Sequence, residues 1–351
     1  MWFKTLTGFS EINPDQVRDN LSVDGNLLTS HVNGKKYVCG VLETPSLAEL
    51  RSRLMRSEIS PGTLCVREIL ADAQQLHADE CNAGALFQVA SQFNLLEMIS
   101  PDITPEDGVD GYEHDFTQGP ACAIAAGAGT IYRNYLVEIN GQKGQSADNQ
   151  IDCLHDIGVA LANLDPGNLD SDNLDSDNLN QDHSGHHLWE MKNGYALATK
   201  NGLNEITDRL NAASESEMDS LRSLLRIGLH WNTEVTIADS HHTVSQAYCS
   251  ALPVAYSNHS PDRWQRFAQL VLEASYEAVI CAGILNYRET GNATVYLTLI
   301  GGGAFGNDSQ WIMSALYYAL KRYKYMPLDV VIVSRRRSNV HVQDLIQQLI
   351  A

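Results

Sequence analysis

A short acidic stretch in the first third of the chain holds the residue types that most directly suggest chemistry. It reads PEDGVDGYEHD, from Pro105 to Asp115. Neighbouring carboxylates raise one another's pKa values, so one group can hold a proton while another stays ionised. Such a loop is often only a solvated surface, but its position between a predicted buried strand and a predicted buried helix favours a catalytic role. Its carboxylates are Glu106, Asp107, Asp110, Glu113 and Asp115.

A turn suited to an anion follows the acidic stretch. Residues 117–123 read TQGPACA, so small residues and a glycine meet a helix that is predicted to begin near Pro120. The first N–H groups of a helix have no partner inside it, and they can face a phosphate. We therefore predict that Gln118, Gly119 and Cys122 form one wall of a phosphate site beside the carboxylates.

A second turn of this kind lies near the end of the chain, in the stretch LTLIGGGAFGND. Gly301 to Gly306 satisfy the pattern G-x-G-x-x-G between a predicted strand and a predicted helix, where glycines let the backbone approach a diphosphate. A tight strand-to-helix turn without a ligand is the alternative. Two such turns could grip one diphosphate from both sides, with the carboxylates near one end of the ligand. The residues predicted to bind it are Gly302, Gly303, Ala304, Phe305, Gly306 and Asn307.

Two other enzyme classes fit parts of the sequence. An NADP-dependent enzyme would use the glycine turn for the diphosphate and Arg335–Arg337, after the next strand, for a 2′-phosphate. However, the motif lies about 50 residues from the end of the sequence, which leaves too little chain for the usual nucleotide-binding half. A cysteine hydrolase would use Cys249 with His241 or His242, although a buried structural cysteine is the commoner case.

A degenerate repeat of N-L-D-S-D runs from Asn163 to Asp182 and has almost no core-forming residues. Such a composition cannot offset the entropy of ordering, so we predict a disordered acidic insertion over residues 163–187. A calcium loop is not favoured, because Leu174 would fill its fifth position and no Glu follows at its twelfth. The histidines that follow, His183, His186 and His187, read as exposed loop residues, and no metal site is predicted.

Strands and helices must hold these segments in place. Residues 21–43 alternate around the turn pairs Asp24-Gly25 and Asn33-Gly34, which predicts a hairpin or meander. Further strands are predicted at 84–93, 231–238, 294–300 and 328–334, and helices at 46–55, 120–136, 203–228, 262–285, 309–323 and 342–350. Strands that alternate with helices indicate an α/β fold with a largely parallel or mixed sheet. Ligands of such sheets bind at the carboxyl ends of the strands.

Composition narrows the function classes. The chain has 24 Lys and Arg against 43 Asp and Glu, a net charge of −19. Such an acidic chain is not expected to bind nucleic acid. No run of about 18 apolar residues is present, so no membrane span is expected, and the start of the sequence lacks the apolar centre of a signal peptide. Seven widely spaced cysteines without a CxxC pair indicate reduced thiols and a cytoplasmic protein.

Four stretches together resemble the macrodomain superfamily: FQVASQFNLLEM, the acidic loop, TQGPACA, and VYLTLIGGGAFGN before a helix. The resemblance is greater to the poly(ADP-ribose) glycohydrolase branch and to bacterial effectors of the MavL type, which remove ADP-ribose from ubiquitin. It covers residues 60–351 and implies a macrodomain-like three-layer fold with a mixed, largely parallel sheet between helices. Residues 1–59 would then form a β-rich N-terminal extension. The glycohydrolase signature of three glycines and a Gln-Glu-Glu is absent after Asn94, and the acidic loop stands in its place.

The resemblance implies a hydrolase that cleaves the N- or O-glycosidic bond at the anomeric carbon of the distal ribose, without a cofactor. Its transition state resembles an oxocarbenium ion, which a carboxylate stabilises or an acid assists. Asp107, Glu113 and Asp115 are the predicted catalytic residues, and Asp115 is nearest in sequence to the TQGPACA turn. Gln92 and Asn94 are predicted to touch adenosine or the distal ribose, and Phe305 would pack on the sugar.

The partners implied by the resemblance are ADP-ribose and an ADP-ribosylated protein, with ubiquitin as a candidate. If the chain is an effector, it would act inside a host cell. A non-catalytic reader of ADP-ribose remains the main rival, since it would use the same phosphate turns with an inert acidic loop. The number of carboxylates in that loop favours the enzyme.

Overall fold

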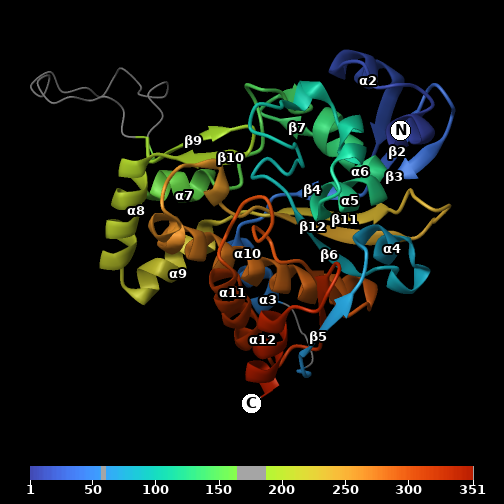
Figure 1. Cartoon of the computed structure of the whole chain (residues 1–351). Helices are drawn as coiled ribbons and strands as arrows, with labels where there is room; N and C mark the ends of the chain where they lie inside the picture. The colour runs from blue at the N-terminus through green and yellow to red at the C-terminus, as the bar shows by residue number, and fades with distance from the viewer. Residues whose placement is uncertain (57–60, 164–186, 351) are drawn as a thin grey trace, which may run out of the picture.

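A seven-stranded sheet forms the middle layer of the molecule (Figure 1). In the computed structural model, which describes residues 1–56, 61–163 and 187–350, the five strands from β12 to β5 are parallel to one another. The pairs β4–β11 and β11–β12 are antiparallel. The predicted mixed, largely parallel sheet is therefore confirmed. In order across the sheet, the strands are β4 (Val41–Glu43), β11 (Gly228–Glu234), β12 (Thr243–Cys249), β6 (Leu86–Ala90), β13 (Thr294–Leu297), β14 (Asp329–Ser334) and β5 (Cys65–Leu70).

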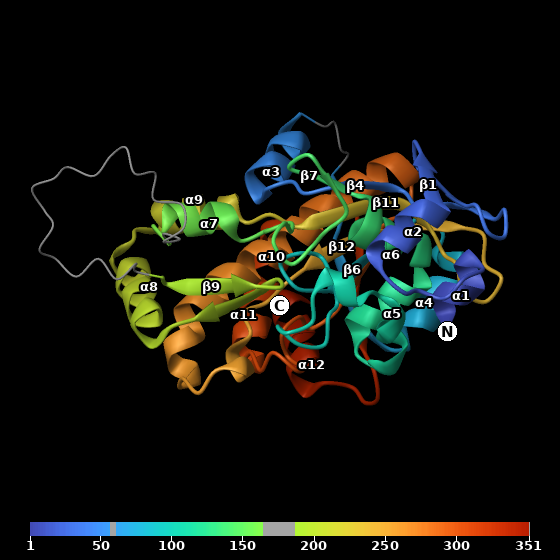
Figure 2. The same cartoon turned by 90° about the horizontal axis from the view of Figure 1, so that it is seen from above.

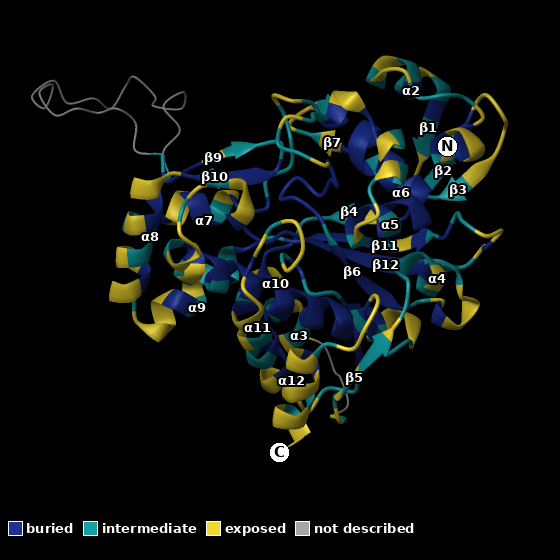
Figure 3. Cartoon of the chain, viewed as in Figure 1, coloured by how far each residue is buried: buried dark blue, intermediate teal, exposed yellow. Residues whose placement is uncertain are grey.

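The central strands are buried on both faces, as the dark ribbons of β6 and β12 show (Figure 3). Leu86 of β6 belongs to the largest hydrophobic cluster, whereas Phe87, the next residue, belongs to a second cluster with Tyr296 and Val331. Successive side chains of a strand face opposite sides, so a strand covered on both sides needs a continuous apolar run. The run ALFQVA supplies it, which is why the sequence pattern located this strand.

One face of the sheet is covered by helices around α10 (Pro261–Thr290), which packs against β6, β12 and β13. By length and composition, α10 is the one described helix able to cross a membrane, which the search for apolar runs in the sequence did not anticipate. However, 89% of its most apolar stretch is buried inside the molecule, as in a core helix. Its helical neighbours are α3 (Leu47–Met55), α8 (Lys200–Ala212), α9 (Glu215–Leu224) and α11 (Ser309–Arg322), and α12 (Val340–Ile350) packs against α11 and β5.

The other face carries α4 (Ala73–Ala78), α5 (Gln118–Ala125) and α6 (Gly127–Ile131). The single helix predicted over residues 120–136 is wrong, because the chain breaks at Ala126 (φ −112°, ψ 56°). There, Thr236 donates its N–H to the Ala125 carbonyl and accepts the Gly127 N–H on its hydroxyl. These tertiary hydrogen bonds replace helical ones, and the chain continues as a π-helical turn, η4 (Tyr132–Leu136).

The N-terminal segment packs over α6 and the acidic loop (Figures 1 and 2). Its predicted meander is confirmed as an antiparallel sheet, and Phe3 and Leu28 share a buried cluster with Tyr112 of the acidic loop. The proposed boundary at residue 59 stays a prediction, while β4 and α3, which precede it, pair and pack with the main body. The segment contains α1 (Trp2–Thr7), α2 (Pro14–Asn20), β1 (Leu21–Asp24), β2 (Leu27–Ser30) and β3 (Lys36–Val38).

A second group of small elements lies beside α8 and α9, at the side remote from the N-terminal segment (Figure 2). It consists of α7 (His155–Ala160) and a hairpin of β9 (Trp189–Lys192) and β10 (Tyr195–Ala198). The helix predicted over residues 203–228 is two helices, α8 and α9. Most of the acidic repeat, with its calcium-like positions and with His183 and His186, lies outside the described residues.

Candidate functional site

A cavity of about 450 Å³ opens at the carboxyl ends of β12, β6 and β13. Because these strands are parallel, the segments that leave them meet at one edge of the sheet, where α/β proteins bind ligands. The start of α5 forms one wall, and the glycine turn after β13 forms the facing wall. Residues more than 170 positions apart in the sequence, such as Gln118 and Gly303, therefore line one space.

The shape of the glycine turn depends on backbone conformations that favour glycine. Gly301 and Gly306 have φ of 76° and 68°. A Cβ on Gly301 would lie 2.7 Å from the amide nitrogen of Asn307, which is itself buried and donates to the Leu252 carbonyl at 2.8 Å. Asn307 therefore holds the turn rather than the ligand. A Cβ on Gly303 would meet no atom within 4 Å, so this glycine faces open space at the cavity wall.

Backbone donors are available in this turn. In the described part of the chain, the N–H groups of Gly303, Ala304 and Phe305 have no hydrogen-bond acceptor, and all three residues line the cavity. The start of α11 is partly engaged, because the carboxylate of Asp308 caps it by accepting the Gln310 N–H at 2.7 Å. An anion at this wall would therefore be bound by the loop itself.

The facing wall keeps its helix start open. Thr117 forms no side-chain cap at the start of α5. Gln118 accepts the Ala90 N–H at 2.9 Å and donates to the Gln88 carbonyl at 2.8 Å, which ties α5 to the end of β6. A Cβ on Gly119 would lie 2.0 Å from the Ala90 carbonyl oxygen, so only glycine permits this approach. Gln118 and Gly119 line the cavity, whereas the buried Cys122 lies behind them.

Only one of the three predicted catalytic carboxylates reaches the cavity. Asp115 is half-buried at its wall and accepts the Thr117 N–H at 2.8 Å. It also lies close enough to Tyr195 to raise the pKa of that phenol, although burial is the main cause of the shift. Asp115 is therefore the acidic-loop residue whose carboxylate a ligand in the cavity can meet.

Asp107 and Glu113 are not brought into the cavity. Asp107 accepts the Thr104 N–H at 2.8 Å and caps the short turn η2 (Pro105–Asp107) at the surface. Glu113 binds the amino group of Met1 at 2.9 Å and the N–H of Trp2 at 3.3 Å. Both carboxylates lie away from the cavity lining because local and N-terminal donors hold them, so their predicted catalytic role has no support from their positions.

The N-terminal segment fixes the acidic loop through Glu11. Its carboxylate accepts the N–H groups of Val109 and Asp110 at 2.9 and 2.7 Å and the hydroxyl of Tyr135 at 2.5 Å. Gly108 (φ 88°) permits the approach, because a Cβ there would lie 2.3 Å from a Glu11 oxygen. The extension therefore helps to place the loop that ends at Asp115.

Gln92 and Asn94 shape the turn after β6. The Gln92 amide accepts the Met98 N–H at 2.9 Å and donates to its carbonyl at 3.1 Å. Asn94 accepts the Leu96 N–H at 3.1 Å and is fully buried away from the cavity. Gln92 lines the cavity, but its amide is already engaged, so neither side chain is free for the predicted contact with adenosine or ribose.

This turn places a carboxylate that sequence reasoning missed. Glu97 lies at the cavity wall with its side chain only 1% exposed. Burial raises its pKa to about 7, although the Arg133 guanidinium, 3.4 Å away, opposes the shift. Arg133 in turn stacks on the Tyr248 ring at 3.7 Å. A carboxyl group with a pKa near 7 can hold a proton at neutral pH. The available signal was a lone acid in the apolar run NLLEM.

Three aromatic rings close the end of the cavity near Asp115. Phe305 of the glycine turn lies 5.3 Å from Tyr195 and 5.6 Å from Tyr256, centroid to centroid. The Tyr195 hydroxyl donates to the Met98 carbonyl at 2.7 Å. Aromatic faces with polar tips suit a sugar ring, which is apolar on its faces and hydroxylated at its edge. The two tyrosines belong to no motif, so the sequence offered no sign of their meeting.

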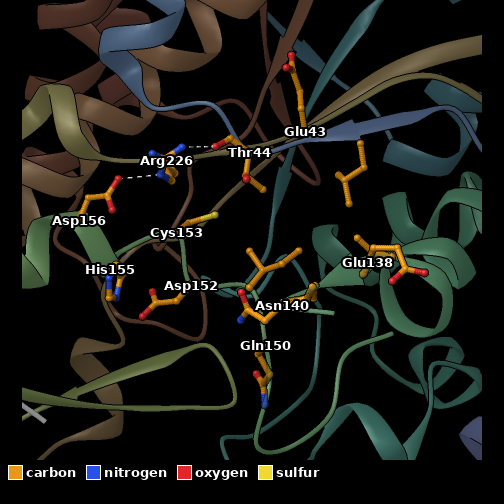
Figure 4. A pocket seen from close by; sticks show the side chains of 14 residues that line it. Glu43, Thr44, Glu138, Asn140, Gln150, Asp152, Cys153, His155, Asp156 and Arg226 are labelled. Carbon is orange, nitrogen blue, oxygen red and sulfur yellow. Dashed lines mark hydrogen bonds and ion pairs between the residues drawn. The ribbon is translucent and has the colours of Figure 1, made fainter. Parts of the chain in front are cut away.

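A second cavity, of about 540 Å³, lies among β4, α7 and the segment before it (Figure 4). Its arginine is already engaged, since Arg226 binds Asp156 at 2.7 Å and the Thr44 carbonyl at 2.9 Å. The Asp152 carboxylate accepts the Leu154 N–H at 2.8 Å. Its lining residues include no glycine. The first cavity, with its free backbone donors, is the better candidate for a ligand site.

Among the residues that the structure describes, Cys249 does not have His241 or His242 beside it as a cysteine hydrolase would require. Cys249 lines the first cavity, but burial raises the pKa of its thiol to about 12. His242 precedes β12, and its Nε2 lies 2.8 Å from the His77 carbonyl. Seven residues of extended strand separate these two side chains by about 20 Å. The described residues therefore give this alternative no support, and Cys249 is a buried cysteine, the commoner case.

No protein-family model matches the sequence, and no curated protein matches it. Among solved structures, the chain is similar to poly(ADP-ribose) glycohydrolase from Deinococcus radiodurans in complex with ADP-ribose, with 11% identity, a TM-score of 0.43, and coverage of 88% of this chain and 93% of that one. It is also similar to the Thermomonospora curvata glycohydrolase, with 11% identity, a TM-score of 0.42, and coverage of 96% and 97%. For that enzyme bound to the inhibitor ADP-HPD, the values are 11%, 0.41, 95% and 97%. The structural neighbours of the chain are thus poly(ADP-ribose) glycohydrolases at low sequence identity, a likeness that concerns the fold alone.

Proposed function

We propose that the chain binds ADP-ribose in the first cavity and hydrolyses the bond between its distal ribose and a modified protein. One observation carries the proposal. The backbone donors of Gly303–Phe305 face a space that also contains the carboxylates of Asp115 and Glu97. Donors of this kind bind diphosphate, and a pair of carboxyl groups suits cleavage at an anomeric carbon. The volume is of the size that small-molecule sites have.

The positions of the groups define how the ligand would lie. The anomeric carbon must be near Asp115, and the aromatic rings of Phe305 and Tyr195 at the same end would hold the distal ribose. The diphosphate then follows the free N–H groups of the glycine turn. The adenosine half would occupy the rest of the cavity.

The two carboxyl groups can divide the chemistry. The Asp115 carboxylate accepts a proton from water, whose oxygen then bonds to the anomeric carbon, and the carboxylate stabilises the oxocarbenium-like transition state. Glu97 holds a proton near neutral pH because it is buried, and it donates that proton to the leaving oxygen or nitrogen of the modified protein. The products are free ADP-ribose and the unmodified side chain.

Two measurements distinguish a hydrolase from a non-catalytic reader of ADP-ribose. Calorimetric titration with ADP-ribose measures binding, and chromatography of an ADP-ribosylated protein after incubation measures free ADP-ribose. The proposal requires both binding and release. Binding without release would identify a reader, and the absence of binding would reject the cavity as an ADP-ribose site.

The identity of the modified protein is a finer part of the proposal. The sequence resemblance to MavL-type effectors supports ADP-ribosylated ubiquitin, and the acidic chain is compatible with a basic target surface. A cytoplasmic location, of this cell or of a host, is in keeping with seven free cysteines. Comparing release from ADP-ribosylated ubiquitin and from an unrelated ADP-ribosylated protein tests the target. Equal rates would remove the support for ubiquitin.

A further inference from the structure

Tyr112 connects the N-terminal segment to the buried carboxylate of the first cavity. This tyrosine lies in the turn η3 (Asp110–His114) of the acidic loop and is only 4% exposed. Its hydroxyl accepts the N–H of Glu97 at 2.9 Å and also forms a hydrogen bond with the Glu97 carboxyl. Tyr112 does not line the cavity itself, so it can act on a bound ligand only through Glu97.

The ring of Tyr112 is held by the N-terminal segment. It belongs to the buried cluster that contains Phe3 of that segment. Leu96 and Met98, the two neighbours of Glu97 in the sequence, belong to the same cluster. The N-terminal segment therefore shares one core with the side chain that binds the Glu97 carboxyl and with the backbone that carries Glu97.

The other ionisable groups that act on Glu97 come from three further elements. Arg133 of η4 lies 3.4 Å from the carboxylate, which is long for a charge-assisted hydrogen bond. Burial is the main reason that the pKa values of Tyr248 on β12 and Cys122 on α5 are raised, and the nearby Glu97 adds to both shifts. Arg133 thus supplies charge to Glu97, whereas the hydroxyl of Tyr112 gives its carboxyl a direction.

The phenol of Tyr112 keeps its proton at working pH. Burial, and to a lesser extent the charge of Glu97, raise the pKa of this phenol well above its ordinary value. A protonated hydroxyl can donate to a carboxyl oxygen whether that carboxyl is ionised or protonated, because each form has an oxygen that accepts. The contact can therefore persist while Glu97 loses and regains a proton.

We propose that Tyr112 is a positioning residue for Glu97, and that the N-terminal segment takes part in the reaction through it, an inference that rests on the proposed function. In that function, Glu97 donates a proton to the leaving atom. A general acid is effective only when its proton points at that atom. The core formed with the N-terminal segment holds Tyr112, and Tyr112 holds the carboxyl in that direction.

The chain offers a matched pair of variants. Tyr112→Phe removes the hydroxyl and leaves the ring in its cluster. Tyr37→Phe is the control, because its hydroxyl donates to the Leu6 carbonyl at 3.4 Å and its ring packs against the same cluster. Both variants lose one hydroxyl from one core, but only the first loses a contact with Glu97. Circular dichroism should show that both are folded.

The first test measures the release of ADP-ribose from a modified protein as a function of pH. In the wild type, kcat should fall as the pH rises through about 7, where Glu97 loses its proton. In Tyr112→Phe, we expect the plateau of kcat to be about tenfold lower. The falling limb should lie at higher pH, because the lost hydrogen bond had lowered the pKa of Glu97. Affinity for ADP-ribose should stay within about twofold, and Tyr37→Phe should match the wild type in all three measurements.

A second test reads Glu97 without turnover. Carbon-13 NMR of labelled glutamate carboxyls follows the titration of Glu97, whose signal is identified by its absence in Glu97→Gln. It should titrate about one pH unit higher in Tyr112→Phe than in the wild type or in Tyr37→Phe. Should Tyr112→Phe not fold, Phe3→Leu takes its place, since it loosens the core around the ring, and smaller shifts in the same directions are expected.

Two outcomes would overturn the inference. One is a folded Tyr112→Phe in which Glu97 titrates, and kcat varies with pH, as in the wild type. The other is a loss of kcat that is equally large when Tyr112→Phe is added to Glu97→Gln, because the hydroxyl would then act elsewhere. Failure of the wild-type chain to bind or release ADP-ribose would instead reject the proposed function.

Discussion

The two walls of the ADP-ribose cavity use different parts of the polypeptide. The glycine wall presents backbone N–H groups, and three successive ones have no acceptor among the described residues. The acidic wall is rich in side-chain carboxylates, but Asp107 and Glu113 are engaged by donors elsewhere in the fold. Only Asp115 reaches the cavity from that loop. The comparison shows that polar groups without a hydrogen-bond partner in the fold indicate a binding site. The number of charged residues in a nearby loop indicates it less well.

The largest expected effect is on turnover, from Asp115→Asn. The carboxylate acts mainly in the transition state, so its loss should lower kcat about 10²–10⁴-fold and leave ADP-ribose affinity within about tenfold. The rate at which ADP-ribose is released from a modified protein measures kcat, and calorimetric titration measures the affinity for ADP-ribose. If affinity and turnover fell by the same factor, Asp115 would be a binding residue and the two walls would not divide the work.

The next largest effect is on binding, from Gly303→Val. The new side chain would enter the cavity, where it meets no protein atom within 4 Å of its Cβ, and would exclude the diphosphate. We expect ADP-ribose affinity to fall about 100-fold or more, with a thermal midpoint close to that of the wild type. Gly111→Val is the control, because that glycine also has open space but lies outside the cavity. Normal binding by folded Gly303→Val would show that the glycine wall holds no ligand.

A third prediction concerns Glu97, the buried acid at the wall of the cavity. The pKa of Glu97 is about 7 in the folded chain and near 4.5 when unfolded. Its contribution to stability is thus fully present below pH 4.5 and is lost as the pH rises through 7. From pH 4.5 to 8, the free energy of unfolding of the wild type should fall by about 3 kcal/mol relative to Glu97→Gln. Urea titrations at several pH values measure it, and parallel pH profiles would place the pKa of Glu97 near its ordinary value.

A smaller effect is expected from the carboxylates that the structure places outside the cavity. Asp107→Asn and Glu113→Gln should keep turnover within about threefold, because each removes a surface contact and no group of the site. Measuring kcat for these two variants and for Asp115→Asn under the same conditions compares three carboxylates of one loop directly. A loss from either variant as large as that from Asp115→Asn would mean that the loop rearranges when the ligand binds.

The smallest effect is expected from removing residues 164–182 and joining the ends by a short Gly/Ser bridge. Asn163 should be kept, because its side chain accepts the N–H groups of Leu188 and Trp189 at 2.8 and 3.3 Å. Turnover should change by no more than a few fold, since the described segments that line the cavity remain intact. A hundredfold loss in a folded variant would show that the acidic repeat takes part in catalysis or in target binding.

What the sequence predicts well is determined locally. The glycine turn was located because the φ values of Gly301 and Gly306 demand glycine at those positions, and the strands were located because buried strands need apolar runs. The break at Ala126 was missed because Thr236, far along the chain, supplies the competing hydrogen bonds. Glu97 was missed as a functional residue for a similar reason, since burial and Arg133 set its pKa and neither is written in the residues beside it.

Because the glycine wall binds its ligand with uncharged groups, the rate of ligand binding should depend on ionic strength in an unusual way. An anionic ligand must approach a chain whose net charge is −19, and it is then held by uncharged N–H groups at short range. Salt screens the long-range repulsion and has little effect on the buried contacts. The association rate of ADP-ribose should therefore rise with salt concentration, which is the reverse of the behaviour of proteins that capture phosphates with a basic surface.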